Sequence, residues 1–233
     1  MTHLQEKLDY LKASLLDMAM LVQSQLQKSG DALFEQDEDL ANEVLHNEKR
    51  VNASELKIDK ECENIFALLT PVAHDMRLVF ATLKTNADLE RIGDYAEGIA
   101  SIVVEGKKGF DKKLVDSLHI QDMYGIVFEM FKDVITAYTH NDSRLARSVF
   151  SRDLQVNDIN HAAMQTVVAY CKENKENIPQ ALNLLSVVRK LERVGDHITN
   201  IAEEVIFFLE ARVLKHGNKG GDNTADHNLS TSA

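Results

Sequence analysis

The chain has 233 residues, of which 44 % are apolar, 27 % charged and 6 % aromatic, with two prolines, ten glycines and no tryptophan. So few aromatic residues disfavour a β-sandwich, and so few turn formers favour long helices. The net charge of −11 argues against a nucleic-acid-binding protein and against direct attraction to anionic lipid. Two cysteines exclude a disulfide framework and a cysteine-based zinc site.

Neither a secretory signal nor a membrane span is expected from the sequence. The N-terminus lacks a charged start followed by an apolar stretch, and the most apolar run, residues 205–209, is too short to cross a bilayer. We therefore expect a cytoplasmic protein.

Apolar residues at three- and four-residue steps predict three helices in the first half of the chain. The first covers residues 4–34, across a helix breaker at Ser29-Gly30. The second begins at the acidic residues 37–39, which suit a helix N-terminus. The third begins at Pro71, with Thr70 as its N-cap, and ends at Gly106.

The second half of the chain repeats this pattern. Residues of the first two helices recur at an offset of 105, and the hexapeptide at 89–94 recurs at 191–196, an offset of 102. Pro179 marks the third helix of the second copy, as Pro71 marks that of the first. We predict an all-α fold of two tandem, similar three-helix bundles with six long helices: a first bundle at 1–110, a second at 111–215 and a disordered tail at 216–233.

The repeated hexapeptide is a poor helix former. Each copy has a glycine inside the helix, which costs about 1 kcal/mol relative to alanine, and two like charges four residues apart: Glu90, Gly93 and Asp94, then Glu192, Gly195 and Asp196. The second helix of each unit adds a carboxylate and an amide at the same spacing: Glu48 with Asn52, and Asp153 with Asn157. Antiparallel packing would align these side chains along one seam. Such an all-oxygen set suits Mg²⁺, Mn²⁺ or Fe, and Zn²⁺ less well.

A solvated charged face is the other interpretation of these residues. Arg91 lies three residues from Asp94, and Arg193 lies three residues from Asp196, so helical ion pairs of a few tenths of a kcal/mol could satisfy the charge. Spacing alone leaves both interpretations open.

Enzymatic activity is not expected. The residues 43–46 form a Glu-x-x-His element, but a ferritin-like di-iron protein needs two such elements. Motifs for nucleophilic catalysis or a phosphate-binding loop are missing from the sequence.

Three segments, residues 70–77, 88–97 and 191–197, together with the duplicated layout, resemble the PhoU family. The resemblance covers nearly the whole chain except the tail. It implies a fold of two three-helix bundles and metal clusters at Glu/Asp-x-x-x-Asp motifs, which this sequence matches at its two hexapeptides. The family's supporting positions on the second helices are those of Glu48, Asn52, Asp153 and Asn157. The second copy keeps the family's asparagine after the motif as Asn200, whereas the first copy has Gly98.

The resemblance also implies a function. Members of the family are negative regulators of phosphate uptake and of the phosphate-starvation (Pho) regulon, and they link the ATPase PstB of the Pst transporter to the sensor histidine kinase PhoR. We accordingly expect a non-enzymatic, metal-binding adaptor that forms a homodimer and meets the membrane only through its partners. The alternative is an adaptor that needs no metal and binds partners through its acidic faces.

Overall fold

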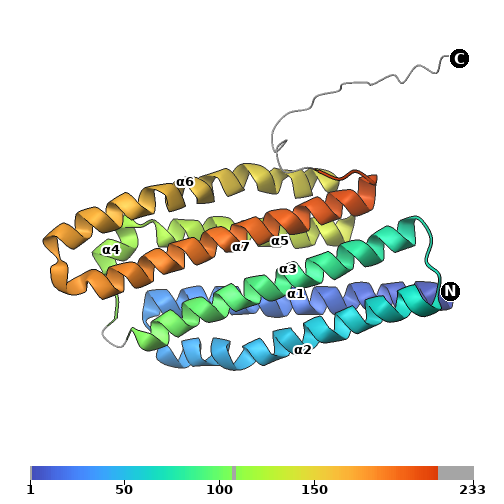
Figure 1. The fold of residues 1–233 in the computed structure, drawn as a ribbon, viewed down its shortest axis with the longest axis horizontal. Helices are drawn as coiled ribbons and strands as arrows, with labels where there is room; N and C mark the ends of the chain where they lie inside the picture. Colours follow the sequence, from blue (N-terminus) through green and yellow to red (C-terminus); the bar gives the residue numbers. More distant parts are fainter. Residues whose placement is uncertain (1, 107–108, 215–233) are drawn as a thin grey trace, which may run out of the picture.

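The computed structural model describes residues 2–106 and 109–214, which form helices joined by short turns (Figure 1). Helices account for the regular structure of this part of the chain, and it contains no β-strand. The helices are α1 (His3–Glu35), α2 (Glu38–Leu68), α3 (His74–Glu105), α4 (Lys112–Ser117), α5 (Ile120–His140), α6 (Ser143–Glu173) and α7 (Ile178–Glu210), with a 3-10 turn at Lys175–Asn177. The predicted all-α fold with six long helices is confirmed, and the six-residue α4 is an additional element. Across the described residues, every helix is too short or too polar to cross a membrane.

Three predicted helix boundaries are confirmed. The Asp37 side chain caps α2 by accepting a hydrogen bond from the Leu40 backbone N–H. Gly106 stands at the C-terminal cap of α3, and Pro179 lies in the first turn of α7, where its missing N–H costs nothing.

The predicted start of the third helix at Pro71 is wrong, because α3 begins at His74. The chain leaves α2 at Leu68 and must reverse direction before His74. It does so through left-handed backbone at Thr70 (φ 43°) and Ala73 (φ 42°), which leaves Pro71 inside the turn. Thr70 therefore does not cap α3, and the helix begins without a side-chain cap.

The first helix continues across Ser29-Gly30 as the apolar pattern predicts, since α1 runs to Glu35. Gly30 makes room for a side chain from the other half of the chain. A Cβ atom there would lie 2.9 Å from Tyr124 Cε1 of α5. The Tyr124 hydroxyl and Ser29 Oγ are hydrogen-bonded at 3.0 Å. The small residues of α1 thus serve packing between the bundles.

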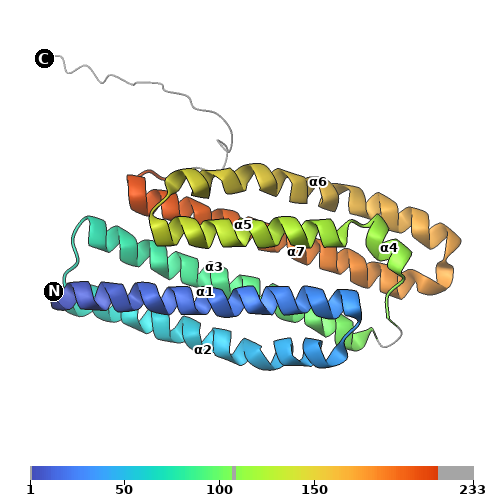
Figure 2. The same cartoon turned by 180° about the vertical axis from the view of Figure 1, so that it is seen from behind.

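The two bundles, α1–α3 and α5–α7, lie side by side and meet along two pairs of helices. Figure 2 shows α1 beside α5, and α3 packs against α7 on the other face (Figure 1). Helices α3 and α7 run antiparallel, since residues early in α3 contact residues late in α7: Arg77 with Phe208, Lys84 with Glu204, and Asp88 with His197.

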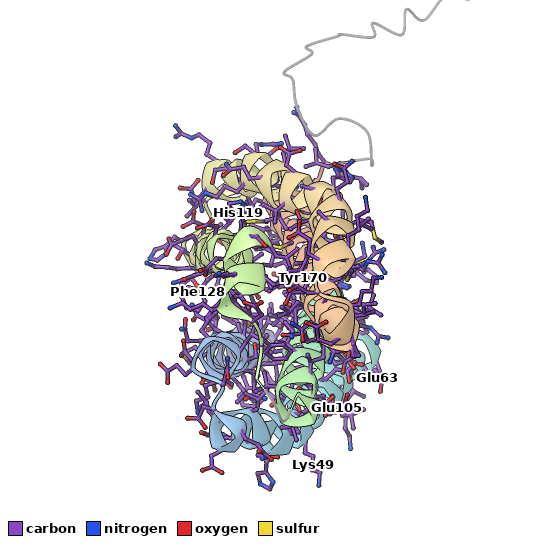
Figure 3. All side chains as sticks on the ribbon, turned by 90° about the vertical axis from the view of Figure 1, so that its left-hand side faces the viewer. Lys49, Glu63, Glu105, His119, Phe128 and Tyr170 are labelled. Carbon is purple, nitrogen blue, oxygen red and sulfur yellow. The ribbon has the colours of Figure 1, made fainter. Side chains whose placement is uncertain are left out.

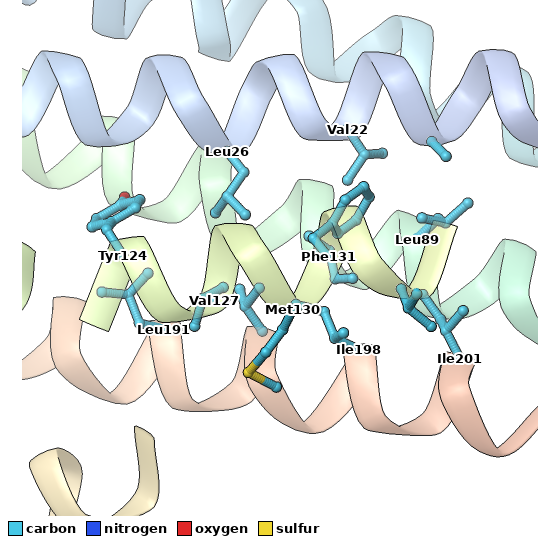
Figure 4. Close-up of a cluster of buried hydrophobic side chains, with 14 of the residues drawn as sticks. Val22, Leu26, Leu89, Tyr124, Val127, Met130, Phe131, Leu191, Ile198 and Ile201 are labelled. Atoms are coloured by element: carbon cyan, nitrogen blue, oxygen red, sulfur yellow. The ribbon is translucent and has the colours of Figure 1, made fainter. Parts of the chain in front are cut away.

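A single apolar core joins the bundles. Figure 4 shows side chains from α1, α3, α5 and α7 in one cluster, with Phe131 of α5 near its middle. Phe131 is 1 % exposed. The predicted boundary between residues 110 and 111 stays a prediction, and the predicted tail at 216–233 lies outside the described residues.

Candidate functional site

In each bundle a mid-helix glycine lies against a buried carboxylate. A Cβ atom on Gly93 of α3 would lie 3.2 Å from Glu48 Oε2 and 3.1 Å from a methyl group of Val51, both on α2. A Cβ atom on Gly195 of α7 would lie 3.1 Å from Asp153 Oδ1 of α6. Glu48 and Asp153 are only 4 % and 1 % exposed. Each glycine therefore makes room for a carboxylate of the adjacent helix, which accounts for an unfavourable helix residue at both places.

The predicted site residues lie on two pairs of helices, α2 with α3 and α6 with α7, and these two sets are here called the acidic seams. The first acidic seam consists of Glu48, Asn52, Glu90 and Asp94, and the second of Asp153, Asn157, Glu192 and Asp196. The deepest member of each seam comes from the second helix of its bundle. The motif carboxylates on α3 and α7 line the more exposed edge.

An exposed arginine bridges the two motif carboxylates of each seam. Its distances are nearly identical in the two copies: Arg91 to Asp94 3.1 Å and to Glu90 3.5 Å, Arg193 to Asp196 3.1 Å and to Glu192 3.6 Å. The ion pairs expected from the spacing are therefore present. Exposed pairs of this kind contribute about 0–1 kcal/mol, so another cation can displace the guanidinium group at small cost.

The carboxylate deepest in the first seam lacks any compensating donor. Neither oxygen of Glu48 has a hydrogen-bond partner among the described residues. Burial, together with the nearby charges of Asp94, Glu97 and Glu90, raises the pKa of Glu48 to about 7. Glu48 is thus a buried acid with no hydrogen-bond donor among the described residues, which does not fit a solvated face at this position.

The motif glutamates respond to the same environment. Burial raises the pKa of Glu90, and the adjacent Asp94 raises it further despite Arg91. In the second seam, burial and then Asp196 raise the pKa of Glu192. Negative charge is therefore crowded beyond what the arginines neutralise.

The two seams differ in their amides. Asn157 donates a hydrogen bond to Asp153 Oδ2 at 3.1 Å, whereas the equivalent Asn52 is exposed. Across residues 2–106 and 109–214, no three His, Cys, Asp or Glu side chains converge as a formed metal centre. The seams are clusters of neighbouring carboxylates whose oxygens suit a hard cation, and binding one would require the side chains to turn toward it.

Helices α3 and α7 also meet through a polar contact that the repeat did not reveal. Asp88 accepts a hydrogen bond from Asn200 Nδ2 at 3.1 Å, and His197 Nδ1 lies 2.8 Å from the same oxygen. The repeat counterpart of Asp88 is Lys190, and a Cβ atom on Gly98 would lie 2.6 Å from its Nζ. A side chain at position 98 would therefore require the flexible end of Lys190 to move.

Three titratable residues near the seams were missed by the sequence analysis. Glu97 raises the pKa of Glu48, Glu55 raises that of Glu90, and His161 lowers that of Glu192. Glu97 lies three residues after Asp94, and Glu55 lies seven after Glu48, so helical spacing could have found both. A search based on duplication misses them, because their counterparts in the other copy are not acidic.

The Glu-x-x-His element is exposed at both ends, Glu43 and His46, and does not face the core.

Comparison with known proteins identifies the family. The model of the PhoU domain matches residues 15–103 and again residues 120–205. The chain belongs to the PhoU family. It is 33 % identical over 210 residues to a phosphate-specific transport system accessory protein PhoU homolog from Burkholderia sp, covering 90 % of this chain and 89 % of that one. It is 32 % identical over 216 residues to the phosphate-specific transport system accessory protein PhoU of Escherichia coli (strain K12), covering 93 % and 88 %.

A solved structure confirms the architecture. The crystal structure of PhoU from Pseudomonas aeruginosa superposes with a TM-score of 0.85 at 32 % identity, covering 89 % of this chain and 99 % of that one. Each PhoU domain match contains one complete acidic seam. The second match begins where α5 begins, at Ile120, whereas the first begins inside α1.

The raised pKa of Glu48 predicts a pH-dependent stability. Between about pH 4.5 and 7 the folded chain binds more protons at Glu48 than the unfolded chain, so its contribution to stability falls as pH rises through this window. Glu48→Gln removes this loss. In metal-free protein we expect the Tm of the variant to exceed that of the wild type on the order of 2–4 °C at pH 8, and no such gain at pH 5.

Thermal unfolding followed by circular dichroism at the two pH values measures this difference. Glu63→Gln, at an exposed position of α2, is the matched control and leaves the Tm unchanged. A Glu48→Gln protein that is less stable than wild type at pH 8 would contradict the prediction.

Proposed function

We propose that this protein is a non-enzymatic negative regulator of phosphate uptake and of the phosphate-starvation (Pho) regulon. It acts by binding, linking the ATPase PstB of the Pst transporter to the sensor kinase PhoR. The observation that carries the proposal is the PhoU domain match over both halves of the chain. Relatives that cover nine-tenths of the chain are named as accessory proteins of phosphate-specific transport.

The fold supports an adaptor role. One continuous core joins the two bundles, so a partner bound to one bundle is held in a fixed orientation relative to a partner on the other. We propose a cytoplasmic homodimer that reaches the membrane through its partners, because a chain of net charge −11 is repelled by anionic lipid.

Deletion of the gene in the source bacterium tests the regulatory role. At high phosphate we expect alkaline phosphatase to be expressed and phosphate uptake to rise, because the brake on the kinase and the transporter is gone. A plasmid copy of the wild-type gene restores repression. Phosphatase that stays repressed in the deletion strain, together with unaltered uptake, would show the regulator assignment to be wrong.

We further propose that the acidic seams bind divalent or trivalent cations, Fe, Mn or Mg in preference to Zn. The support is the buried, unpartnered Glu48 carboxylate beside the motif carboxylates of α3, and the same arrangement of acids on α6 and α7. In the first seam Glu48, Glu90 and Asp94 would hold the cation, and in the second Asp153, Glu192 and Asp196, with Asn52 and Asn157 as neutral oxygen donors. A bound cation would supply positive charge where Arg91 and Arg193 now supply it.

The alternative, an adaptor independent of metal, draws support from these same arginine pairs. Their distances, 3.1 Å to Asp94 and to Asp196, satisfy the motif aspartates without any ion. In that case the acidic seams serve as faces for basic partners.

Metal content distinguishes the two. Protein purified without chelator is compared by mass spectrometry of its metals with the variant Glu90→Ala, Asp94→Ala, Glu192→Ala and Asp196→Ala. We expect about one or more ions per wild-type chain and a loss of most of them in the variant, because a hard cation needs several carboxylate ligands. Equal, substoichiometric metal in both proteins would favour the metal-independent adaptor.

A further inference from the structure

Gly125 of α5 is a glycine inside a helix, and no neighbour among residues 2–106 and 109–214 explains it. The other helix-interior glycines of the described residues each make room for an internal neighbour: Gly30 for Tyr124, Gly93 for Glu48, Gly98 for Lys190 and Gly195 for Asp153. A Cβ atom on Gly125 would meet no atom within 4 Å. Glycine is less favourable than alanine in a helix, and at this open position it leaves room for another segment to approach the α5 backbone closely.

The surface on both sides of Gly125 is hollowed. One hollow of about 370 Å³ lies between α1 and α5, and another of about 330 Å³ lies between α5 and α6; both are lined by Gly125 and Glu129. The two hollows share Gly125 and Glu129 in their lining, and the surface that they make on both sides of the glycine is here called the Gly125 groove. Helices α1 and α5 expose this face in Figure 2, and Phe128 of α5 is labelled beside it in Figure 3. A groove over a residue without a side chain fits a crossing helix.

The lining of the Gly125 groove selects the charge of its occupant. Its α1–α5 half combines the aromatic side chains of Phe34 and Phe128 with the carboxylates of Asp31 and Glu129. Within the described residues neither carboxylate forms an ion pair, although Gln27 donates a hydrogen bond to Asp31. Across the glycine, the guanidinium of Arg152 is already paired with Asp133 at 2.6 Å. The groove therefore offers unneutralised negative charge beside aromatic rings, which attracts lysine and arginine.

We propose that the Gly125 groove is the docking site for a basic, apolar-faced helix of a protein partner in the phosphate-transport machinery. This inference rests on the proposed function for the existence of such a partner. A second copy of this chain is the less favoured occupant of this groove, because a two-fold contact through it would bring Asp31 and Glu129 of both copies together. Docking here leaves both acidic seams open, since they lie between other pairs of helices.

Two kinds of variant test the docking site, with binding to the full-length detergent-solubilised transporter and to the full-length sensor kinase of the same bacterium as the readout. A Cβ atom at Gly125 meets no atom within 4 Å, so Gly125→Leu places a side chain in the groove, and we expect it to weaken binding to the transporter about tenfold or more. Asp31→Asn with Glu129→Gln removes the lining charge and weakens binding together with its salt dependence. Glu63→Gln with Glu173→Gln removes two exposed charges elsewhere and leaves binding unchanged.

Gly125→Ala separates docking from folding. It raises the Tm by about 2–4 °C, because a helix gains a better residue at a site with free space, and this rules out a structural reason for the glycine. If both groove variants bind the partner as tightly as the wild-type protein does, the inference is wrong and the proposed function still stands. Wild-type protein that binds neither partner would overturn both. A Gly125→Leu protein whose oligomeric state changes in sedimentation while partner binding stays intact would identify a second copy as the occupant and also overturn the inference.

Discussion

In each bundle, the packing of the second helix against the third depends on a carboxylate buried against a glycine. Glu48 against Gly93 and Asp153 against Gly195 are equivalent contacts, and both pairs join the second and third helices of a bundle. A side chain in place of either glycine would have to displace a buried acid or a buried valine. The chain tolerates two helix-weakening glycines because they let acidic side chains lie where apolar ones would otherwise pack.

Burying a charged carboxylate is unfavourable, and the surrounding side chains offset this cost only in part. The arginines of the motifs neutralise the exposed edge of each acidic seam, but Glu48 has no donor at either oxygen. A buried carboxylate without a partner takes up a proton or binds a cation. The first acidic seam is therefore the part of the molecule whose charge state is most open to change, and it lies one helix away from the contact between the bundles.

That contact breaks the symmetry of the duplication. Helices α3 and α7 cross in antiparallel fashion, so a symmetric chain would repeat the bonds of Asp88 to His197 and Asn200. Instead, Lys190 replaces the aspartate, and its Nζ lies 6.0 Å from the centre of the Tyr95 ring. One side of the crossing is held by hydrogen bonds to a carboxylate and the other by a cation over an aromatic ring. The two bundles are thus chemically distinguishable, as an adaptor between two different partners requires.

The sequence predicted the features that are periodic or local. Apolar residues spaced three and four apart predicted the six long helices. The offset between the two copies pointed to the residues of the acidic seams. Asp37 marked the start of a helix because its own side chain caps it. The turn at Thr70 and Ala73 was missed because the backbone there is set by where α2 ends and α3 can begin. The packing role of Gly30 was missed because its neighbour, Tyr124, is distant in sequence. Burial of Glu48 beside an exposed Asn52 depends on the rotation of α2 about its axis, which only the packed structure fixes.

Direct titration of the Glu48 carboxyl group measures whether the acid is buried as described. Carbon-detected NMR of metal-free protein, with the resonance assigned by comparison with the Glu48→Gln variant, follows its protonation from pH 3 to pH 9. Burial beside Gly93, with Asp94 and Glu90 nearby, predicts a pKa of about 7. A pKa near 4.5, the value of an ordinary exposed glutamate, would contradict a buried, unpartnered carboxylate at the centre of the first acidic seam.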